Sequence, residues 1–469
     1  MTKKFFTALL AAALSGCVVG PNYKRPQVST PGEFRGSTES QQGAPSAVSM
    51  ADIKWNALFA DETLNKLIET ALQGNFDVRI AAERVQQARA QVGIVRAGQF
   101  PTLDAQAGFT ASRPSTLGSF RFLPPGTNLS ASYTQLGAAL SWEIDLWGRL
   151  RRLTEAARAN YLATEEVRHG IIVSLVSDVT SAYFQLLEFE LELDISRKTR
   201  GVAADSLRLV QLRRERGAAS GLDVRQAEQL LYTAAAQIEA VERGIAQTEN
   251  GLSLLLGATP SAQPRGRGLD QIAVPPEVPA GLPSALLERR PDIRSAEQNL
   301  IAANAEIGAA RALYFPQLSL TAFAGAQSRA LTEIATVPAR MFTLAPSAVL
   351  PIFRAGEIRS RVRVSEVRQR ELLVAYEQSI YNGLREVSDA LVGYSRTRAQ
   401  RTEQEQLVRA LEDTVRLSTL RYKGGLDSYL QVLDSQRNLF TGELGLAQLR
   451  LQERLAVVQL YAALGGGWQ

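Results

Sequence analysis

The sequence of 469 residues contains one cysteine, one histidine and three methionines. One cysteine cannot form a disulfide within the chain, and together with one histidine it cannot supply a four-ligand zinc site. The methionines Met1, Met50 and Met341 offer no thioether relay for copper or silver ions. These shortages argue against a disulfide-stapled fold and a metal centre. Because the sequence also shows no clustered carboxylate pair, an enzyme is not expected.

An excess of charge of one sign is also missing. The chain has 52 basic and 47 acidic residues, which gives a net charge of +5. Binding to nucleic acid needs a concentrated basic face, so no nucleic-acid partner is expected. The glycine run Gly465–Gly467 follows the last helical segment and does not open one, so it does not predict a phosphate-binding loop. No cofactor is therefore predicted.

The single cysteine, Cys17, ends a stretch typical of a secretory signal. A short basic start at Lys3 and Lys4 precedes the apolar run Phe5–Leu14, and this order predicts a signal peptide over residues 1–16. The letters LSGC at Leu14–Cys17 resemble a bacterial lipobox, which implies covalent N-acyl and diacylglycerol lipid on Cys17. The alternative is a chance cysteine in a signal sequence. We expect an extended, lipidated segment over residues 17–60, much of it rich in Pro, Gly, Ser and Gln.

The two halves of the chain resemble each other. Phe76–Ala107 aligns with Pro291–Ala322 at an offset of 215 (292 − 77), and Arg208–Leu231 aligns with Arg416–Leu439 at an offset of 208 (425 − 217). This spacing is far longer than the period of solenoid repeats. We interpret it as a duplicated unit, with a first repeat at 61–256, a linker rich in Pro and Gly at 257–283 and a second repeat at 284–469.

Each half contains two segments with the alternation of a half-buried β-strand. In Thr102–Ser112 and Leu136–Leu146, apolar residues fall on one face, while Asp104, Glu143 and Asp145 fall on the other. The second half repeats the pattern less cleanly around Leu318–Gln327 and Phe342–Phe353, where Pro346 weakens the prediction.

These strands have roughly the length of membrane-spanning strands, about 9–11 residues. The acidic residues would then face a wet lumen, and Trp142 and Trp147 would suit a membrane interface. Four strands cannot close a membrane barrel, because the smallest such barrels use eight. The barrel would have to be shared between chains, with eight strands from two copies or twelve from three.

Long helices are predicted after each pair of strands. The sequence has no proline between Pro125 and Pro260, and apolar residues from Val224 to Leu255 repeat at alternating spacings of three and four. We expect helices from about Arg149 to Arg216 and from about Leu222 to Leu256, joined by a turn at Gly217–Gly221. A coiled-coil scaffold or helical bundle would account for these helices but would leave the strands unexplained.

The combined motifs resemble outer-membrane efflux lipoproteins of the TolC/OprM-like (NodT-type) outer membrane factor family. The motifs are GCVVGPNYKRP after the signal, FPTL and FPQL before strands, DLWGR and LPIFRAG after strands, and RYKGGLDSYLQVLDSQR near the C-terminus. The resemblance implies an α+β membrane protein, a homotrimer whose twelve-stranded β-barrel is continued by a long periplasmic α-helical barrel.

The resemblance also implies a function and partners. The chain would be the gated exit duct of a tripartite efflux pump, exporting drugs or other small toxic compounds across the bacterial outer membrane. Its partners would be a periplasmic membrane-fusion adaptor, an inner-membrane resistance-nodulation-division transporter and outer-membrane lipid. A type I protein or peptide secretion duct and a metal-ion efflux channel are the alternatives.

In the family the gate lies at the periplasmic helix tips. By motif position, Leu430 would form an apolar constriction and Asp434 a ring of carboxylates, with Arg437 one helical turn further on. A solvated helix residue is the alternative for Asp434. The resemblance assigns ties between neighbouring helices to these residues: Tyr422, Lys423 and, as acceptor, Asp223.

The chain departs from TolC itself at two positions: TolC has an arginine tie where this chain has Asp427, and a second acidic residue where this chain has Gln431. The predicted ring therefore has fewer carboxylates, and the set of residues that tie neighbouring helices is not fixed by the resemblance. A separate hypothesis concerns the arginines after strands two and four, which either contact lipid phosphates or are solvated. They are Arg149, Arg151, Arg152, Arg359, Arg361 and Arg363.

Overall fold

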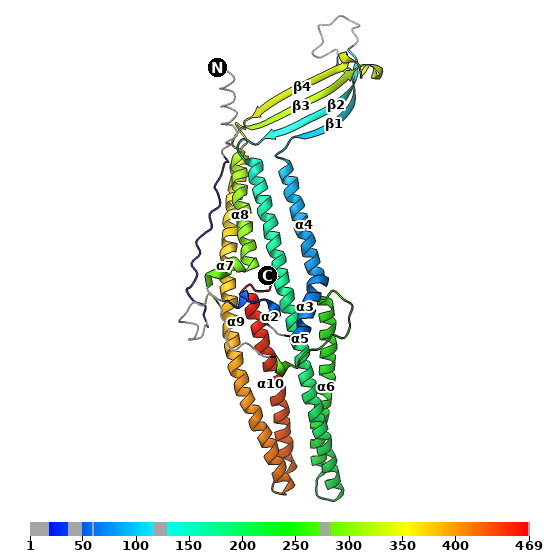
Figure 1. Cartoon of the computed structure of the whole chain (residues 1–469), viewed down its shortest axis with the longest axis vertical. Coiled ribbons are helices and arrows are strands. Elements are labelled where there is room, and N and C mark those ends of the chain that lie inside the picture. Colours follow the sequence, from blue (N-terminus) through cyan, green and yellow to red (C-terminus); the bar gives the residue numbers. More distant parts are fainter. Residues whose placement is uncertain are drawn as a thin grey trace. The chain divides into compact units, whose positions relative to one another are not determined.

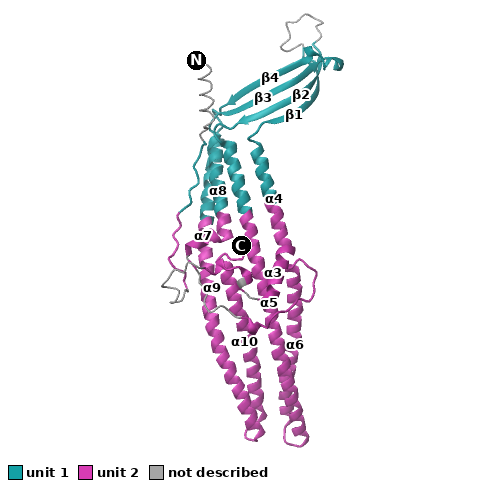
Figure 2. Cartoon of the chain, viewed as in Figure 1, with its two compact units in different colours: residues 1–26, 86–164, 297–375 teal, residues 27–85, 165–296, 376–469 magenta. Residues whose placement is uncertain are grey.

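A computed structural model describes residues 18–35, 49–58, 61–115, 129–272, 281 and 283–467. Cys17 and the predicted signal peptide lie outside these residues. The chain forms two compact units, coloured separately in Figure 2. Unit 1 comprises residues 1–26, 86–164 and 297–375, and unit 2 comprises residues 27–85, 165–296 and 376–469. Each unit takes segments from both halves of the sequence, while the repeat boundaries at 256 and 284 stay a prediction.

The order of elements repeats (Figure 1). The first half contains α3 (Glu62–Gly74), α4 (Phe76–Ala97), β1 (Thr102–Ser112), β2 (Ala131–Ile144), α5 (Arg149–Glu215) and α6 (Gly221–Leu255). The second half contains α7 (Leu286–Arg289), α8 (Pro291–Ala312), β3 (Gln317–Ser328), β4 (Arg340–Val349), α9 (Glu357–Lys423) and α10 (Tyr429–Ala463). Short elements are η1 (Met50–Asp52), α2 (Trp55–Leu58), η2 (Leu269–Gln271), η3 (Pro283–Ala285), η4 (Leu331–Glu333) and η5 (Val337–Ala339).

The lengths of equivalent helices confirm the internal repeat. Helices α5 and α9 each have 67 residues, α6 and α10 each have 35, and α4 and α8 each have 22. The two long helices of the first half end within one residue of the predicted positions at both ends.

The structure confirms the four predicted strands, but some of the predicted first and last residues are wrong. Strand β1 has the predicted bounds, but β2 begins five residues before Leu136 and ends at Ile144. Strand β4 ends at Val349, before Phe353. Pro351 explains this early end, because proline cannot donate to a ladder. Pro346 lies within β4, opposite Leu320 of β3, and within the chain β4 is paired on this one side only.

The strands form one antiparallel sheet in the order β1-β2-β3-β4. Its register aligns Ala105 with Ala138, Ala138 with Ala324, and Ala324 with Phe342. Residues directly opposite each other share a face of the sheet. The next row in the same alternation contains Leu103, Leu140, Ala322 and Leu344. Apolar residues of all four strands are therefore gathered on one face.

The opposite face of the sheet is more polar. Thr102 pairs with Ser141 and Ser141 with Thr321, while Glu143 pairs with Ser319. Asp104 lies on this face next to Ala139. Both edges of the sheet, β1 and β4, have a strand on one side only within the chain. Most of their side chains are exposed, including large apolar ones such as Phe109 and Phe342.

The segment after Cys17 is held against unit 1 by specific contacts. The amide of Val19 donates to the carbonyl of Trp147 at 3.1 Å, and Arg25 binds Glu297 through two hydrogen bonds. Gly20 passes so close to Gly308 that a Cβ on Gly20 would overlap the backbone of Gly308. The backbone approach at this point requires glycine.

The arginines after β2 are bound within the chain. Arg149 forms two hydrogen bonds to Glu143, and Arg151 pairs with Asp145. Arg152 is buried and donates to Asn22 Oδ1 at 2.8 Å and to the carbonyls of Val19 and Gly20. These three side chains order the strand–helix junction and the N-terminal segment, so their contacts do not support the lipid-phosphate hypothesis.

One joint in unit 2 is built twice, once in each half. The Asn75 side chain donates to the carbonyl of Leu255 at 2.9 Å, and its repeat equivalent Arg290 donates to the carbonyl of Ala463 at 2.9 Å. The acceptors are also repeat equivalents (463 − 255 = 208). The buried Arg290 adds bonds to Asp292 and Glu386, so the second joint is ionic where the first is neutral.

Helix α5 supplies much of the core of unit 2. Tyr183, Phe184, Leu186 and Leu187 are fully buried. Among the described residues, α5 is the one helix with an 18-residue window apolar enough to cross a membrane, and 44% of that window is buried. This burial is typical of a helix that packs against other helices.

Glu188 is a buried carboxyl on α5, and it predicts a pH dependence of stability. Burial and the neighbouring Glu192 raise the pKa of Glu188 to about 8. Because the pKa is raised in the folded state, the protonated Glu188 side chain contributes fully to stability below its unfolded pKa near 4.5. This contribution is lost as the pH rises through about 8. We expect Glu188→Gln to be more stable than wild type at pH 9, on the order of 2 kcal/mol, and nearly unchanged at pH 5.

Denaturant unfolding of the Glu188→Gln protein at both pH values checks this expectation. The exposed Glu239 provides a matched control, because Glu239→Gln should show the wild-type pH profile. Parallel pH profiles for wild type and Glu188→Gln would show that Glu188 ionises normally.

Candidate functional site

The two tips of the helical hairpins in unit 2 are built by the same turn. Two residues after the end of each of α5 and α9 is a glycine with positive φ, 74° at Gly217 and 71° at Gly425. The amide of Ala218 donates to the carbonyl of Arg213 at 2.8 Å, and the amide of Leu426 donates to the carbonyl of Arg421 at 3.0 Å. This is the glycine-dependent C-terminal motif that satisfies the last helical carbonyls.

The helices that follow the two turns begin differently. Helix α6 has a capping box, in which Ser220 and Asp223 satisfy each other's backbone amides. Helix α10 has no side-chain cap at Ser428, and the residue equivalent to Asp223 is Gln431. A missing cap typically costs about 1 kcal/mol. The start of α10 is therefore less stabilised than the start of α6.

An ion pair spans the second turn. Arg421 Nε lies 2.6 Å from Asp427 Oδ2, and this bond lowers the pKa of Asp427 below its usual value. The pair closes the ends of the turn between α9 and α10. The repeat equivalent of Asp427 is Ala219, so the first turn has no such pair (427 − 208 = 219).

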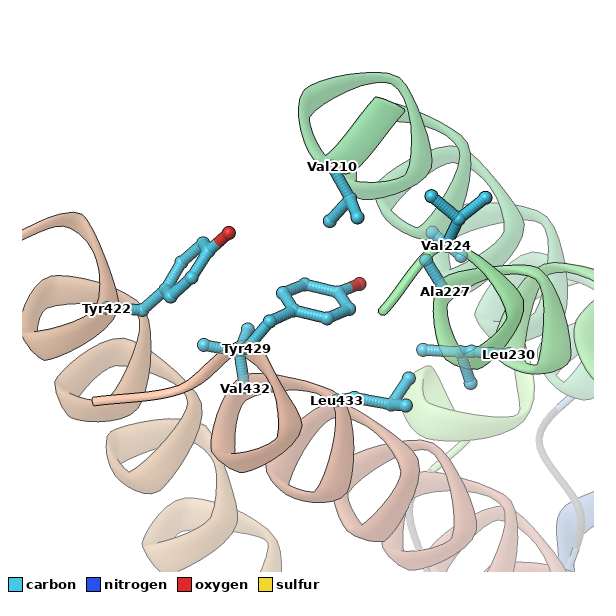
Figure 3. Packing of buried hydrophobic residues seen from close by; sticks show 9 residues of the cluster. Val210, Val224, Ala227, Leu230, Tyr422, Tyr429, Val432 and Leu433 are labelled. Atoms are coloured by element: carbon cyan, nitrogen blue, oxygen red, sulfur yellow. The ribbon is translucent and has the colours of Figure 1, made fainter. Parts of the chain in front are cut away.

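A buried cluster holds the two hairpins together at their tips, as Figure 3 shows. Its members are Ala203 and Val210 of α5, Val224, Ala227 and Leu230 of α6, Tyr422 of α9, and Tyr429, Val432 and Leu433 of α10. The rings of Tyr422 and Tyr429 lie 5.5 Å apart. Burial raises the pKa of Tyr429. This cluster is the shared core of the two tips.

The predicted tie residues lie in different environments within the chain. Tyr422 is 8% exposed, and the Arg213 guanidinium lies 4.4 Å from the centre of its ring. Lys423 is exposed at the end of α9. Asp223 caps α6 through Ser220. The structure of one chain therefore does not bring Tyr422 or Lys423 onto Asp223, and their role between chains stays a prediction.

The three predicted gate residues share one stripe of α10. Leu430, Asp434 and Arg437 have the spacing i, i+4, i+7, so they lie on one face of the helix. Leu430 is 48% exposed, and the Asp434 side chain is 52% exposed. Arg437 Nη2 donates to Asp434 Oδ1 at 3.1 Å, and Asn438 Nδ2 donates to Asp434 Oδ2 at 3.2 Å. The Asp434 carboxylate is thus paired with a cation of its own helix.

This stripe forms one wall of a groove of about 350 Å³ between α6 and α10. The other wall contains Gln226, the repeat equivalent of Asp434, and Gln229, the equivalent of Arg437. The charged pair on α10 is therefore matched by neutral amides on α6. The charged residues that line this groove therefore come from the second repeat.

The tip residues that were not predicted include Arg213, Ser220, Arg421 and Tyr429. The repeat alignment carries a signal for one of them, since it pairs Arg213 with Arg421 but places alanine opposite Asp427. Arg213 consequently has no acidic partner in its own turn and covers Tyr422. The cap at Ser220 follows the pattern of serine three residues before an acidic side chain.

The predicted interface aromatics lie in unit 1 near one end of the sheet. Trp142 Nε1 donates to the carbonyl of Gln99 at 3.0 Å, just before β1. Trp147 Nε1 donates to the carbonyl of Pro316 at 2.8 Å, and its ring stacks on Phe315 at 4.7 Å. Indoles of this kind combine an apolar body with one satisfied polar atom, which is the chemistry of a membrane interface.

Within the described ranges, no cluster of three or more His, Cys, Asp and Glu side chains is arranged around a common centre.

Comparisons with known proteins cover nearly the whole chain. The sequence model of the family "Outer membrane efflux protein" matches residues 67–258 and 282–466. The toluene efflux pump outer membrane protein TtgI of Pseudomonas putida is 39% identical over 458 residues, covering 97% of this chain and 96% of that protein. The cation efflux system protein CusC of Escherichia coli is 34% identical and covers 99% of both.

Solved structures give the same result. The chain matches a membrane protein of Pseudomonas aeruginosa with a TM-score of 0.88 and 33% identity, over 96% of this chain and all of that one. It matches the open state of the MtrE outer membrane channel of Neisseria gonorrhoeae with a TM-score of 0.86 and 32% identity, over 97% and 99%.

Proposed function

This chain belongs to the outer membrane efflux protein family, and from this premise we propose that three copies form a gated exit duct for small toxic organic compounds. Like its relatives, the chain is an outer-membrane channel component of an efflux pump. It is not an enzyme. The observation that carries the proposal is the four-stranded sheet of unit 1, with apolar residues of every strand on one face and both edges open.

The open edges support closure of the sheet by other copies. All three pairs within the chain are antiparallel, so β1 and β4 run in opposite directions. Strand β4 of one copy can therefore pair with β1 of the next in the same antiparallel sense. Three copies give twelve strands, enough to surround a lumen, and the apolar face then contacts lipid.

The gate is proposed at the tips of unit 2. Leu430 is the apolar constriction, and Asp434 with Arg437 forms a charged ring next to it. Support comes from their shared, exposed stripe on α10 and from the uncapped start of that helix. The ties between neighbouring copies are proposed at Tyr422, Lys423 and Asp223. Exposed polar ties, such as those proposed for Lys423, are worth about 1 kcal/mol or less each, so a partner could release them.

Lipid on Cys17 is proposed as an additional anchor in the outer membrane. The residue after it, Val18, lies against Gly148, the residue that precedes α5. The contacts of Val19, Gly20 and Arg25 support this role, because they hold the first residues after Cys17 beside the base of the sheet.

The substrate class is proposed from the relatives. Those that are 36–39% identical include pump proteins named for solvent, toluene and antibiotics, whereas CusC, named for cations, is 34% identical. This favours small organic compounds over metal ions. The partners proposed are a periplasmic adaptor and a proton-driven inner-membrane transporter of the resistance-nodulation-division type.

Cross-linking in cells tests the partners. A photoreactive residue placed beside Gly217 or Gly425 should capture a periplasmic adaptor, and mass spectrometry should recover a proton-driven pump with it. Recovery of an ATP-driven exporter would contradict the proposed efflux of small compounds and would indicate protein or peptide secretion. The same label on the exposed Glu239, away from the tips, is the control.

A further inference from the structure

A polar cavity of about 230 Å³ lies in unit 2 where the end of η2 meets α9 and α10. Nine residues line it: Asp270, Ile272, Tyr394, Arg398, Arg401, Glu405, Arg450, Glu453 and Arg454. Four of these are arginines and three are acids, so the lining carries an excess of one positive charge. The gate residues of α10 are not among them.

The most buried cation of the cavity, Arg454, has no anionic partner in direct contact among the described residues. It is 6% exposed, and its bonds go to the carbonyls of Leu269, Ile272 and Arg450. Its Nε is buried without a hydrogen-bond partner in the described part of the chain. Burial lowers the pKa of Arg454 to about 10. A buried guanidinium that bonds only to neutral oxygens keeps much of its desolvation cost.

The carboxylates of the cavity are bound mainly to a different arginine. Arg401 Nη1 lies 2.6 Å from Glu405 Oε1, and Arg401 Nε lies 2.8 Å from Glu453 Oε2. Arg450 reaches Glu405 only at 3.9 Å, beyond hydrogen-bond distance. Two guanidinium groups, those of Arg450 and Arg454, therefore retain donors at the wall of one cavity.

We propose that this cavity binds a small oxyanion of the size and charge of inorganic phosphate, held by Arg450 and Arg454. A guanidinium presents a planar fork of donors that matches the oxygens of such an anion. Bound there, the anion neutralises the excess charge and accepts hydrogen bonds from donors that Arg450 and Arg454 present at the wall of the cavity. It also joins the end of η2, which follows the first repeat, to the α9–α10 hairpin of the second. The site does not depend on the channel function.

Equilibrium dialysis of the purified full-length protein in detergent tests the site, with radiolabelled inorganic phosphate at pH 7 and constant ionic strength. We expect saturable binding of one phosphate per chain. The substitution Arg450→Gln should weaken it about tenfold or more, because it removes a charge-assisted hydrogen bond. Arg450→Lys keeps the charge but loses the planar fork of donors, so its affinity for phosphate should lie between those of the wild type and Arg450→Gln.

The control is Arg416→Gln, since Arg416 is an exposed arginine of α9 that pairs with Asp413 outside the cavity. It should bind phosphate like the wild type. Circular dichroism establishes that each variant is folded. Absence of saturable binding in the wild type, or equal affinity in wild type and Arg450→Gln, would overturn the proposal.

Discussion

Replacing Ala138 with arginine is expected to prevent stable insertion of the channel into a bilayer. Ala138 lies near the middle of β2 on the apolar face of the sheet, between Ala105 and Ala324. An arginine facing lipid near the middle of the membrane costs about 2–4 kcal/mol per copy. In a trimer this cost is incurred three times. Separation of inserted from soluble protein by carbonate extraction of outer membranes measures the effect.

The neighbouring residue provides a matched control. Ala139 lies on the opposite face, beside Asp104, and Ala139→Arg introduces the same side chain one position along the same strand. Because this face is assigned to the lumen, Ala139→Arg should insert like the wild type. Failure of Ala139→Arg with normal insertion of Ala138→Arg would show that the two faces of the sheet are assigned the wrong way round.

Replacing Asp434 with alanine is expected to change the ion selectivity of the channel. Each Asp434 is paired with Arg437 of its own helix, so its removal leaves an unpaired cation in every copy. Three such cations around one axis would repel other cations, over a screening length of about 10 Å at 0.1 M salt. In a planar bilayer with a KCl gradient, the reversal potential should shift toward anion preference relative to the wild type.

Two further variants identify the origin of this effect. Gln226 lies opposite Asp434 in the groove and is neutral, so Gln226→Ala should leave the reversal potential unchanged. Combining Asp434→Ala with Arg437→Ala removes both charges and should return the selectivity close to that of the wild type. If Asp434→Ala alone has wild-type selectivity, Asp434 does not line the conducting path.

The fold could be predicted largely because its patterns are periodic and occur twice. Alternation in Thr102–Ser112 and the helical spacing from Val224 to Leu255 each define an element without knowledge of its partners. The start of β2 was missed because Ala131–Gln135 is mostly polar, and its strand form depends on pairing with β1. The end of β4 was missed because apolar residues continue past Pro351, which breaks the ladder.

The candidate site could be predicted only in part. Motif position placed Leu430, Asp434 and Arg437, and the helical period explains why the structure gathers them on one stripe. The packing of Arg213 on Tyr422 joins α5 to α9, segments more than two hundred residues apart, and no local pattern encodes such a contact. Within the chain, Asp223 forms a cap. Contacts between copies require a second chain.

Engineered cysteines test whether three chains close one barrel by pairing β4 of each copy with β1 of the next. Within one chain β1 and β4 are separated by two strands, which places them about 14 Å apart. A disulfide needs Cα atoms within about 7 Å, so a bond between these strands must join different copies. The panel combines Thr102, Asp104 or Gln106 of β1 with Met341, Thr343 or Ala345 of β4, each changed to cysteine.

After oxidation in the membrane, electrophoresis without reductant counts the chains that are joined. We expect at least one pair to give a ladder of one, two and three chains that ends at three and collapses on reduction. A ladder that ends at two, one that continues beyond three, or single chains for every pair would contradict it.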